Sequence, residues 1–239
     1  MPSDLVSHFL KTAESSELLA IEQIDIMLRL IGAARDPLTR FLDLGSGDGV
    51  LSAAILDEYP AAQGIFLASS MTALNSARKR LHNYGSSMTL LTANLTSPDW
   101  TTAVQSAIPF DAIVSAFALS HLASDRKRTL YSELLSLLVN DGIFLNIEHV
   151  ASATRWTESV WDDYVIDALF GSVIHDSPGK TRAEIAREYY ARASTTGEHL
   201  APLEVQLDWL RECGFVNVEC FLKVLELTVF GGQRGDIAH

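Results

Sequence analysis

Three glycines with regular spacing form the first group of residues that could do chemistry. Gly45, Gly47 and Gly49 alternate with polar residues between two apolar runs, in the stretch FLDLGSGDGV of residues 41–50. Glycine lets a backbone adopt positive φ and approach a ligand closely. The free N–H groups at the start of a following helix would point into the same space. The stretch therefore predicts a ligand-binding turn between a strand and a helix.

Two common glycine motifs do not fit this stretch. A phosphate-binding P-loop requires Gly-Lys-Ser/Thr after four spacer residues, and the stretch contains no lysine. A dinucleotide fingerprint, Gly-x-Gly-x-x-Gly, requires a glycine at position 50, which is Val50. A tight turn without a ligand is the plain alternative. We disfavour it because closely spaced glycines weaken a fold unless something needs the space.

An adjacent acid and histidine form the second group. Glu148 and His149 lie at the end of an apolar run, residues 143–150, that is typical of a strand buried on both faces. At the carboxyl edge of a parallel sheet either side chain could act as a general base, and histidine is suited to this near neutral pH. The alternative is structural: Glu148 caps a neighbouring helix and His149 is a packed loop residue.

Alternating strands and helices must position these groups. Strands are expected at 41–44, 65–68, 89–92, 110–116 and 143–150, then at 215–222 and 224–230 as an antiparallel pair closed by Gly231 and Gly232. Helices are expected at 4–11, 18–32, 50–56, 71–81, 98–107, 124–138 and 202–213, and residues 153–193 contain no strand pattern. This order predicts an α/β fold with a doubly wound, seven-stranded, mostly parallel sheet.

Composition narrows the class of protein. The 239 residues carry a formal net charge of −12 and a pI near 4.9, which argues against a nucleic-acid binder. Cys213 and Cys220, the two cysteines, fit a reducing compartment. The sequence shows no signal-peptide pattern and no run long enough to cross a bilayer. We therefore expect a cytoplasmic protein without membrane contacts and, because its histidines are scattered, without a metal.

The residues Asp43-Leu44-Gly45-Ser46-Gly47-Asp48-Gly49 resemble motif I of the class I S-adenosylmethionine-dependent methyltransferases. Residues 109–122, 137–150 and 203–221 are similar to later strands and loops of that family. The chain also looks like a group of small-molecule methyltransferases related to the carboxy-S-adenosylmethionine synthases. The resemblance implies a Rossmann-like methyltransferase that uses S-adenosylmethionine, releases S-adenosylhomocysteine and methylates a small molecule. A carboxy-S-adenosylmethionine synthase-like enzyme and a non-catalytic ligand-binding protein on this scaffold stay open, as does a homodimer.

The resemblance also implies a set of cofactor contacts. Asp43 would lie near the methionine end of the cofactor, or would simply organise the loop. His121 would lie in the loop beyond the fourth strand, or would cap the helix that begins near Ser124. The implied contacts are Asp43, Gly45, Ser46, Gly47, Ala68, Ser69, Asn94, Leu95, Ser115, Ala116 and His121.

The chain departs from the family pattern at two of these positions. The acid that usually binds the ribose hydroxyls aligns with Ala68, and the acid that usually reads the adenine amino group aligns with Asn94. No Asp or Glu occurs from Tyr59 to Pro98, in a protein with 30 of them. Loss of a charged acceptor is expected to weaken cofactor binding by on the order of 1.5–3 kcal/mol, with Ser69 or Ser70 as a neutral substitute.

A helical lid is expected around the substrate. Residues 151–200 would form it together with the N-terminal helices of residues 1–36, over an α/β core made of residues 37–150 and 201–239. The expected walls of an apolar or aromatic substrate pocket are Trp156, Trp161 and Tyr190. Aromatic residues at helical spacing are more often ordinary core.

Overall fold

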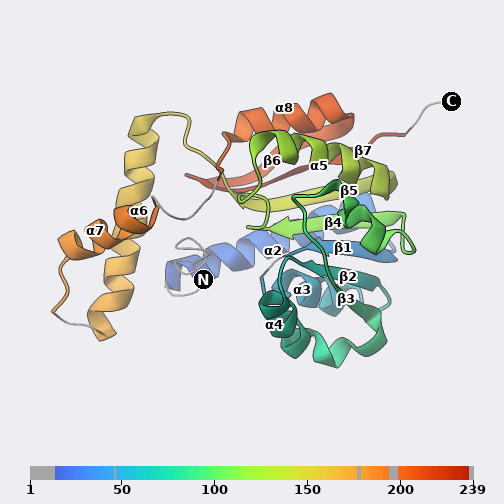
Figure 1. Ribbon diagram of the computed structural model, residues 1–239, viewed down its shortest axis with the longest axis horizontal. Helices are drawn as coiled ribbons and strands as arrows, with labels where there is room; N and C mark the ends of the chain where they lie inside the picture. Colours follow the sequence, from blue (N-terminus) through green and yellow to red (C-terminus); the bar gives the residue numbers. More distant parts are fainter. Residues whose placement is uncertain (1–13, 46, 177–178, 194–198, 237–239) are drawn as a thin grey trace.

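The centre of the computed structural model is one seven-stranded sheet with strand order β3-β2-β1-β4-β5-β7-β6 (Figure 1). The structure describes residues 14–45, 47–176, 179–193 and 199–236, so the expected helix at 4–11 and Ser46 lie outside it. The strands are β1 Arg40–Leu44, β2 Gln63–Ala68, β3 Met88–Thr92, β4 Phe110–Ala116, β5 Leu138–His149, β6 Phe215–Val224 and β7 Leu227–Arg234. Only β7 runs antiparallel to its neighbours, β5 and β6, which confirms the doubly wound, mostly parallel fold.

Helices cover both faces of the sheet (Figure 1). One face carries α2 Glu14–Ala34, α3 Val50–Glu58 and α4 Met71–Leu81. The other carries α5 Ser124–Leu137 and α8 Leu203–Cys213. The short 3-10 helices are η1 His82–Ser87 and η2 Pro98–Val104, the latter in place of the longer helix expected at 98–107. None of the described helices is long and apolar enough to cross a bilayer.

The central strands are mostly apolar because both of their faces are buried. In β1, Phe41 packs with α2, α3 and α4, whereas its neighbour Leu42 packs with α5 and α8. Successive strand residues point to opposite faces, so a strand between two helical layers needs apolar residues at consecutive positions. By the same rule, the side chains of two adjacent polar residues on such a strand point to opposite faces of the sheet.

Several expected strand limits were wrong, and two of the differences have a clear physical reason. β5 begins at Leu138 rather than at residue 143, and its pairing with β4 shifts register near Asp141, which has φ of 59°. The residues around Asp141, where a turn was expected before the strand, instead form a bulge within β5. β7 continues through Gly231 and Gly232 instead of ending there. A Cβ atom on Gly231 would collide with the carbonyl of Phe144, so glycine permits close approach to β5 and does not mark a turn.

Two helices outside the sheet layers form an arm, α6 Arg155–Asp176 and α7 Arg182–Ala193 (Figure 1). Its own apolar cluster includes Trp161 of α6 and Tyr189 of α7, and it meets Leu227 of β7. The two connections of the arm to the sheet lie side by side, since Ala151 N–H donates to Ala201 O at 3.1 Å. The arm falls within the expected lid segment, and its role as a lid stays a prediction.

Candidate active site

The three glycines follow β1 at the carboxyl edge of the sheet. All three have positive φ, at 72° for Gly45, 62° for Gly47 and 84° for Gly49. A Cβ on Gly49 would lie 2.9 Å from Leu81 Cδ1, so this glycine lets α4 pack against the loop. A Cβ on Gly47 would meet nothing within 4 Å. Gly47 therefore faces open space, as a residue against a bound ligand would.

Asp43 lies under the glycine loop. It is fully buried on β1, and its carboxylate accepts from Ser52 Oγ of α3 at 2.6 Å. The bond ties the strand before the loop to the helix after it, because Ser52 lies in the first turn of α3. This geometry fits the loop-organising role. Contact with the methionine end of a cofactor stays a prediction.

The end of β4 lies beside the glycine loop. Ser115 is buried and donates through Oγ to Leu44 O at 3.3 Å, while Ala116 is half-buried. Phe117 has φ of 52° and donates its N–H to Ile147 O at 2.9 Å, which turns the chain at the strand end. The positive φ of Phe117 is a backbone feature that the sequence did not reveal.

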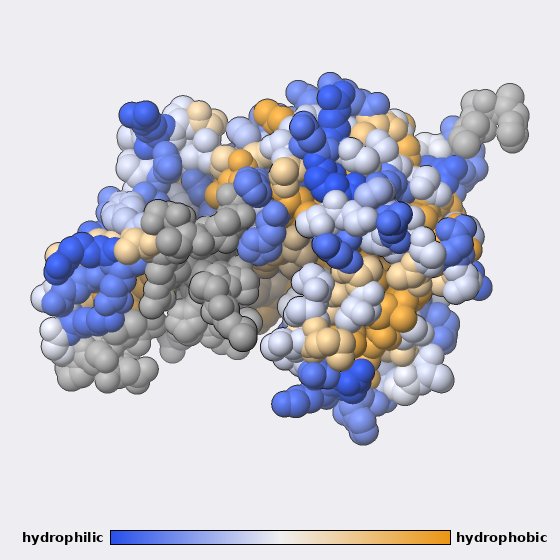
Figure 2. Space-filling view, viewed as in Figure 1, coloured by the Kyte–Doolittle hydropathy of each residue, from blue (hydrophilic) through white to orange (hydrophobic). Residues whose placement is uncertain are grey.

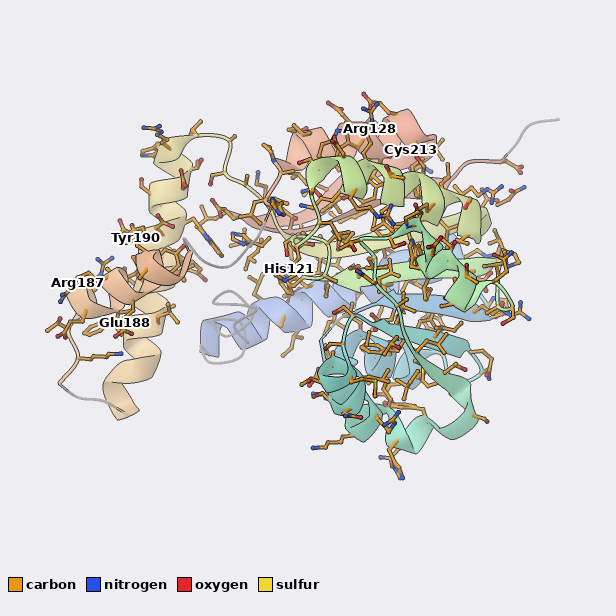
Figure 3. The ribbon with its side chains drawn as sticks, viewed as in Figure 1. His121, Arg128, Arg187, Glu188, Tyr190 and Cys213 are labelled. Atoms are coloured by element: carbon orange, nitrogen blue, oxygen red, sulfur yellow. The ribbon has the colours of Figure 1, made fainter. Side chains whose placement is uncertain are left out.

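His121 is exposed in the loop after β4. Figure 3 shows it at the end of the sheet that faces the arm. The N-cap residue of α5 is Ala123, whose side chain makes no capping hydrogen bond. Both alternatives for His121, the cofactor contact and the helix cap, stay predictions.

The positions expected at the nucleoside end of a cofactor are mostly occupied by other contacts. Ala68 is fully buried in the cluster beneath α4, and Ser69 is exposed. Asn94 Oδ1 accepts from the N–H and the hydroxyl of Thr96, at 3.0 and 2.9 Å. Leu95 is buried, and its carbonyl accepts from Arg126 Nε at 2.6 Å.

Glu148 is buried in the layer between the sheet and α5. One carboxylate oxygen accepts the N–H groups of Leu119 and Ser120, at 3.1 and 3.0 Å, and the other accepts the N–H of His149 at 3.0 Å. Burial raises the pKa of Glu148 to about 7, against the opposing effects of the His149 and Leu119 N–H groups and of the Lys127 charge. Glu148 thus anchors the loop that carries His121.

His149 points to the opposite face of the sheet. It is 7% exposed, its Nε2 lies 2.7 Å from Glu226 Oε2, and its ring lies 5.4 Å from that of Trp161 between centroids. This environment agrees with the alternative that His149 is a packed structural residue. A catalytic role for His149 or Glu148 stays a prediction.

The three aromatic residues expected to wall a substrate pocket do not lie in one environment. Trp161 is 1% exposed in the core of the arm, whereas Trp156 of α6 is 74% exposed. Tyr190 of α7 is 53% exposed and lies within the arm in Figure 3, its ring against that of Tyr189 at 5.3 Å. Figure 2 shows mostly hydrophilic side chains over the outer end of the arm. Only the two exposed residues can meet a ligand from solvent.

Lys127 is a buried charged residue next to the site that the sequence analysis did not single out. It is 1% exposed, and its ammonium donates to the carbonyl of His199. The signal was present, because Lys127 shares the apolar face of α5 with Leu130 and Leu134, at helical spacing. Within the part of the chain that the structure describes, no group of His, Cys, Asp or Glu could hold a metal ion.

Comparison with known proteins decides which domain this is. Residues 41–142, from β1 to the turn inside β5, match the family model described as a methyltransferase domain. The chain carries a methyltransferase domain. The glycine loop, the β4 edge and the His121 loop all lie within the matched residues. A search of curated proteins found no significant match.

Solved structures show that this methyltransferase domain has the class I fold. An O-methyltransferase family protein from Burkholderia thailandensis is 17% identical with a TM-score of 0.64, covering 89% of this chain and 56% of that one. The CurJ carbon methyltransferase is 21% identical with a TM-score of 0.65, covering 98% of this chain and 59% of that one. The chain thus spans less than two thirds of the length of either.

Proposed function

We propose that this methyltransferase domain transfers a methyl group from S-adenosylmethionine to a small molecule. The observation that carries the proposal is Gly47, an exposed residue whose positive φ and open surroundings leave room for a ligand against its backbone. Gly47 lies at the carboxyl edge of a parallel sheet, where doubly wound folds bind ligands. A solved structure with a similar fold, PigF with SAH, supports the cofactor class, at 21% identity and a TM-score of 0.54.

The residues fit the methionine end of this cofactor better than its nucleoside end. Gly47 leaves room for close approach of a ligand to the backbone, and Asp43 holds the loop to α3. The bound cofactor would supply a methyl group already activated on a sulfonium. The chain therefore has to position an acceptor and, for an oxygen or nitrogen acceptor, remove a proton.

We further propose His121 as the group that removes this proton. Glu148 accepts three N–H groups in the interior, and His149 is buried against Trp161. His121 is the exposed titratable side chain among these three. Its loop is anchored by Glu148, which would keep the imidazole in place at the edge of the sheet.

An apolar, aromatic acceptor is the substrate class that we favour. A similar O-methyltransferase family 2 structure from Planctomyces limnophilus, 18% identical with a TM-score of 0.55, is a complex with apigenin. The exposed Trp156 and Tyr190 of this chain offer flat apolar surface. They stay candidate substrate contacts.

Calorimetry with S-adenosylmethionine and S-adenosylhomocysteine tests the proposal. We expect saturable binding of both, and methyl transfer to at least one member of a panel of phenols and aromatic heterocycles followed by mass spectrometry. Binding without transfer would favour a non-catalytic protein, the alternative supported by the buried contacts of Glu148 and His149. Absence of binding would contradict the proposed function.

A further inference from the structure

The segment from Tyr59 to Pro98 contains no carboxylate. It supplies β2, α4, η1 and β3, which together form one side of the sheet beyond β1. A carboxylate is the acceptor that binds a pair of ribose hydroxyls most strongly, because it is charged and has two oxygens. No side chain of this segment can fill that role.

Ala68 ends β2, where such an acid is expected. Its methyl group is fully buried in one apolar cluster with Leu74 and Ala77 of α4. Its carbonyl accepts the N–H of Ala93 at 3.0 Å, which continues the pairing of β2 with β3. Position 68 is therefore part of the hydrophobic core and not part of a polar binding surface.

Two of the neutral acceptors nearby, Ser70 and Asn94, already have partners. Ser70 is the N-cap of α4, and its Oγ accepts the N–H of Ala73 at 3.2 Å. Asn94 Oδ1 accepts two hydrogen bonds from Thr96. A ligand that used either oxygen would have to replace a bond that stabilises a helix cap or a turn, so little net affinity would result.

The carboxylates of the glycine loop are also engaged. Asp48 Oδ2 lies 2.6 Å from Arg80 Nη2, so the charge of Asp48 is directed towards α4. Asp43 is buried and accepts from Ser52. Neither carboxylate substitutes for the acid that β2 lacks.

We propose that the domain recognises its adenosyl cofactor through the methionine end and does not read the ribose hydroxyls through a charged group. This inference rests on the proposed function and deepens it. Its consequence is tolerance: a cofactor analogue that lacks a ribose hydroxyl binds nearly as well as the parent compound.

Titration calorimetry of the full chain with S-adenosylhomocysteine and its 2′-deoxy and 3′-deoxy analogues tests the inference. We expect each analogue to lose less than about tenfold in affinity, because a neutral hydrogen bond is worth about 1 kcal/mol. A loss of about tenfold or more, the effect of a charged acceptor, would overturn the inference while leaving the proposed function intact. If S-adenosylhomocysteine itself does not bind, the proposed function fails and the inference with it.

An installed acid provides a second measurement. Ser69 is exposed beside Ala68, so Ser69→Asp adds a carboxylate at the same edge without entering the core. We expect this variant to bind S-adenosylhomocysteine about tenfold more tightly than the 2′-deoxy analogue, and the matched Ser69→Asn variant to lack this preference. Equal binding of both compounds by Ser69→Asp would place the ribose elsewhere and overturn the inference.

Discussion

His149 Nε2 lies 2.7 Å from Glu226 Oε2, in a pair that is almost fully buried between the sheet and the arm. The imidazole ring packs against Trp161 of α6, and the carboxylate comes from the turn between β6 and β7. The pair therefore joins three parts of the fold: the end of β5, the β6–β7 turn and the arm.

His149→Ala is expected to destabilise the protein by about 2–4 kcal/mol. The substitution leaves the Glu226 carboxylate buried without the imidazole and removes the ring that packs on Trp161. Urea denaturation measures the effect. Glu226→Gln, which keeps a polar group of similar size, is the matched variant and should lose less. Unchanged stability of His149→Ala would contradict the structural role of this pair.

Gly47→Val is expected to abolish S-adenosylhomocysteine binding. The added branches would occupy the open space at the glycine loop, and the positive φ would cost about 1–2 kcal/mol. Gly85→Val is the matched control, because Gly85 also has positive φ, 55°, and an open Cβ position outside the site. Thermal unfolding should show that both variants still fold cooperatively, and calorimetry should show lost binding for Gly47→Val alone. Normal binding by Gly47→Val would place the cofactor elsewhere.

Glu148→Gln should remove a pH dependence of stability. With its pKa raised to about 7, Glu148 keeps a proton in the folded protein that the unfolded chain releases above its ordinary value of 4.5. Its contribution to the free energy of unfolding is fully present below pH 4.5 and is lost as pH rises through 7. The wild-type minus variant difference should therefore fall by roughly 2–3 kcal/mol between pH 4.5 and 7.5, measured by urea denaturation. A difference that does not change with pH would contradict this prediction.

His121→Ala is expected to lower turnover with an oxygen acceptor by about 10²–10⁴-fold, the usual contribution of a general base. The affinity for S-adenosylhomocysteine and the stability should change little, because His121 is exposed and lies outside the glycine loop. Single-turnover kinetics over a range of pH separates this effect from product release. Equal loss of turnover at every pH, with weaker cofactor binding, would assign His121 to binding rather than to proton removal.

Much of the fold was predictable from local sequence. The run RFLDL of β1, the breaks around it and the helical spacing of α4 depend on residues close together in the chain, so pattern and turn chemistry suffice. The glycines after β1 were recognisable for the same reason. The length of β7 was not predictable from local sequence. Gly231 is needed there because the carbonyl of Phe144, on a neighbouring strand, leaves no room for a side chain.

The sequence by itself determined that Glu148 and His149 end a buried strand, and that three glycines follow another. Only the tertiary structure decided what surrounds each of them. Strand alternation sends the two side chains to opposite faces, where Glu148 meets the N–H groups of the His121 loop and His149 meets Glu226. In the glycine loop, α4 packs on Gly49 and leaves Gly47 open. Burial and hydrogen bonding at these residues depend on parts of the chain that are far apart in sequence, and a local sequence pattern carries no information about which distant residues come together.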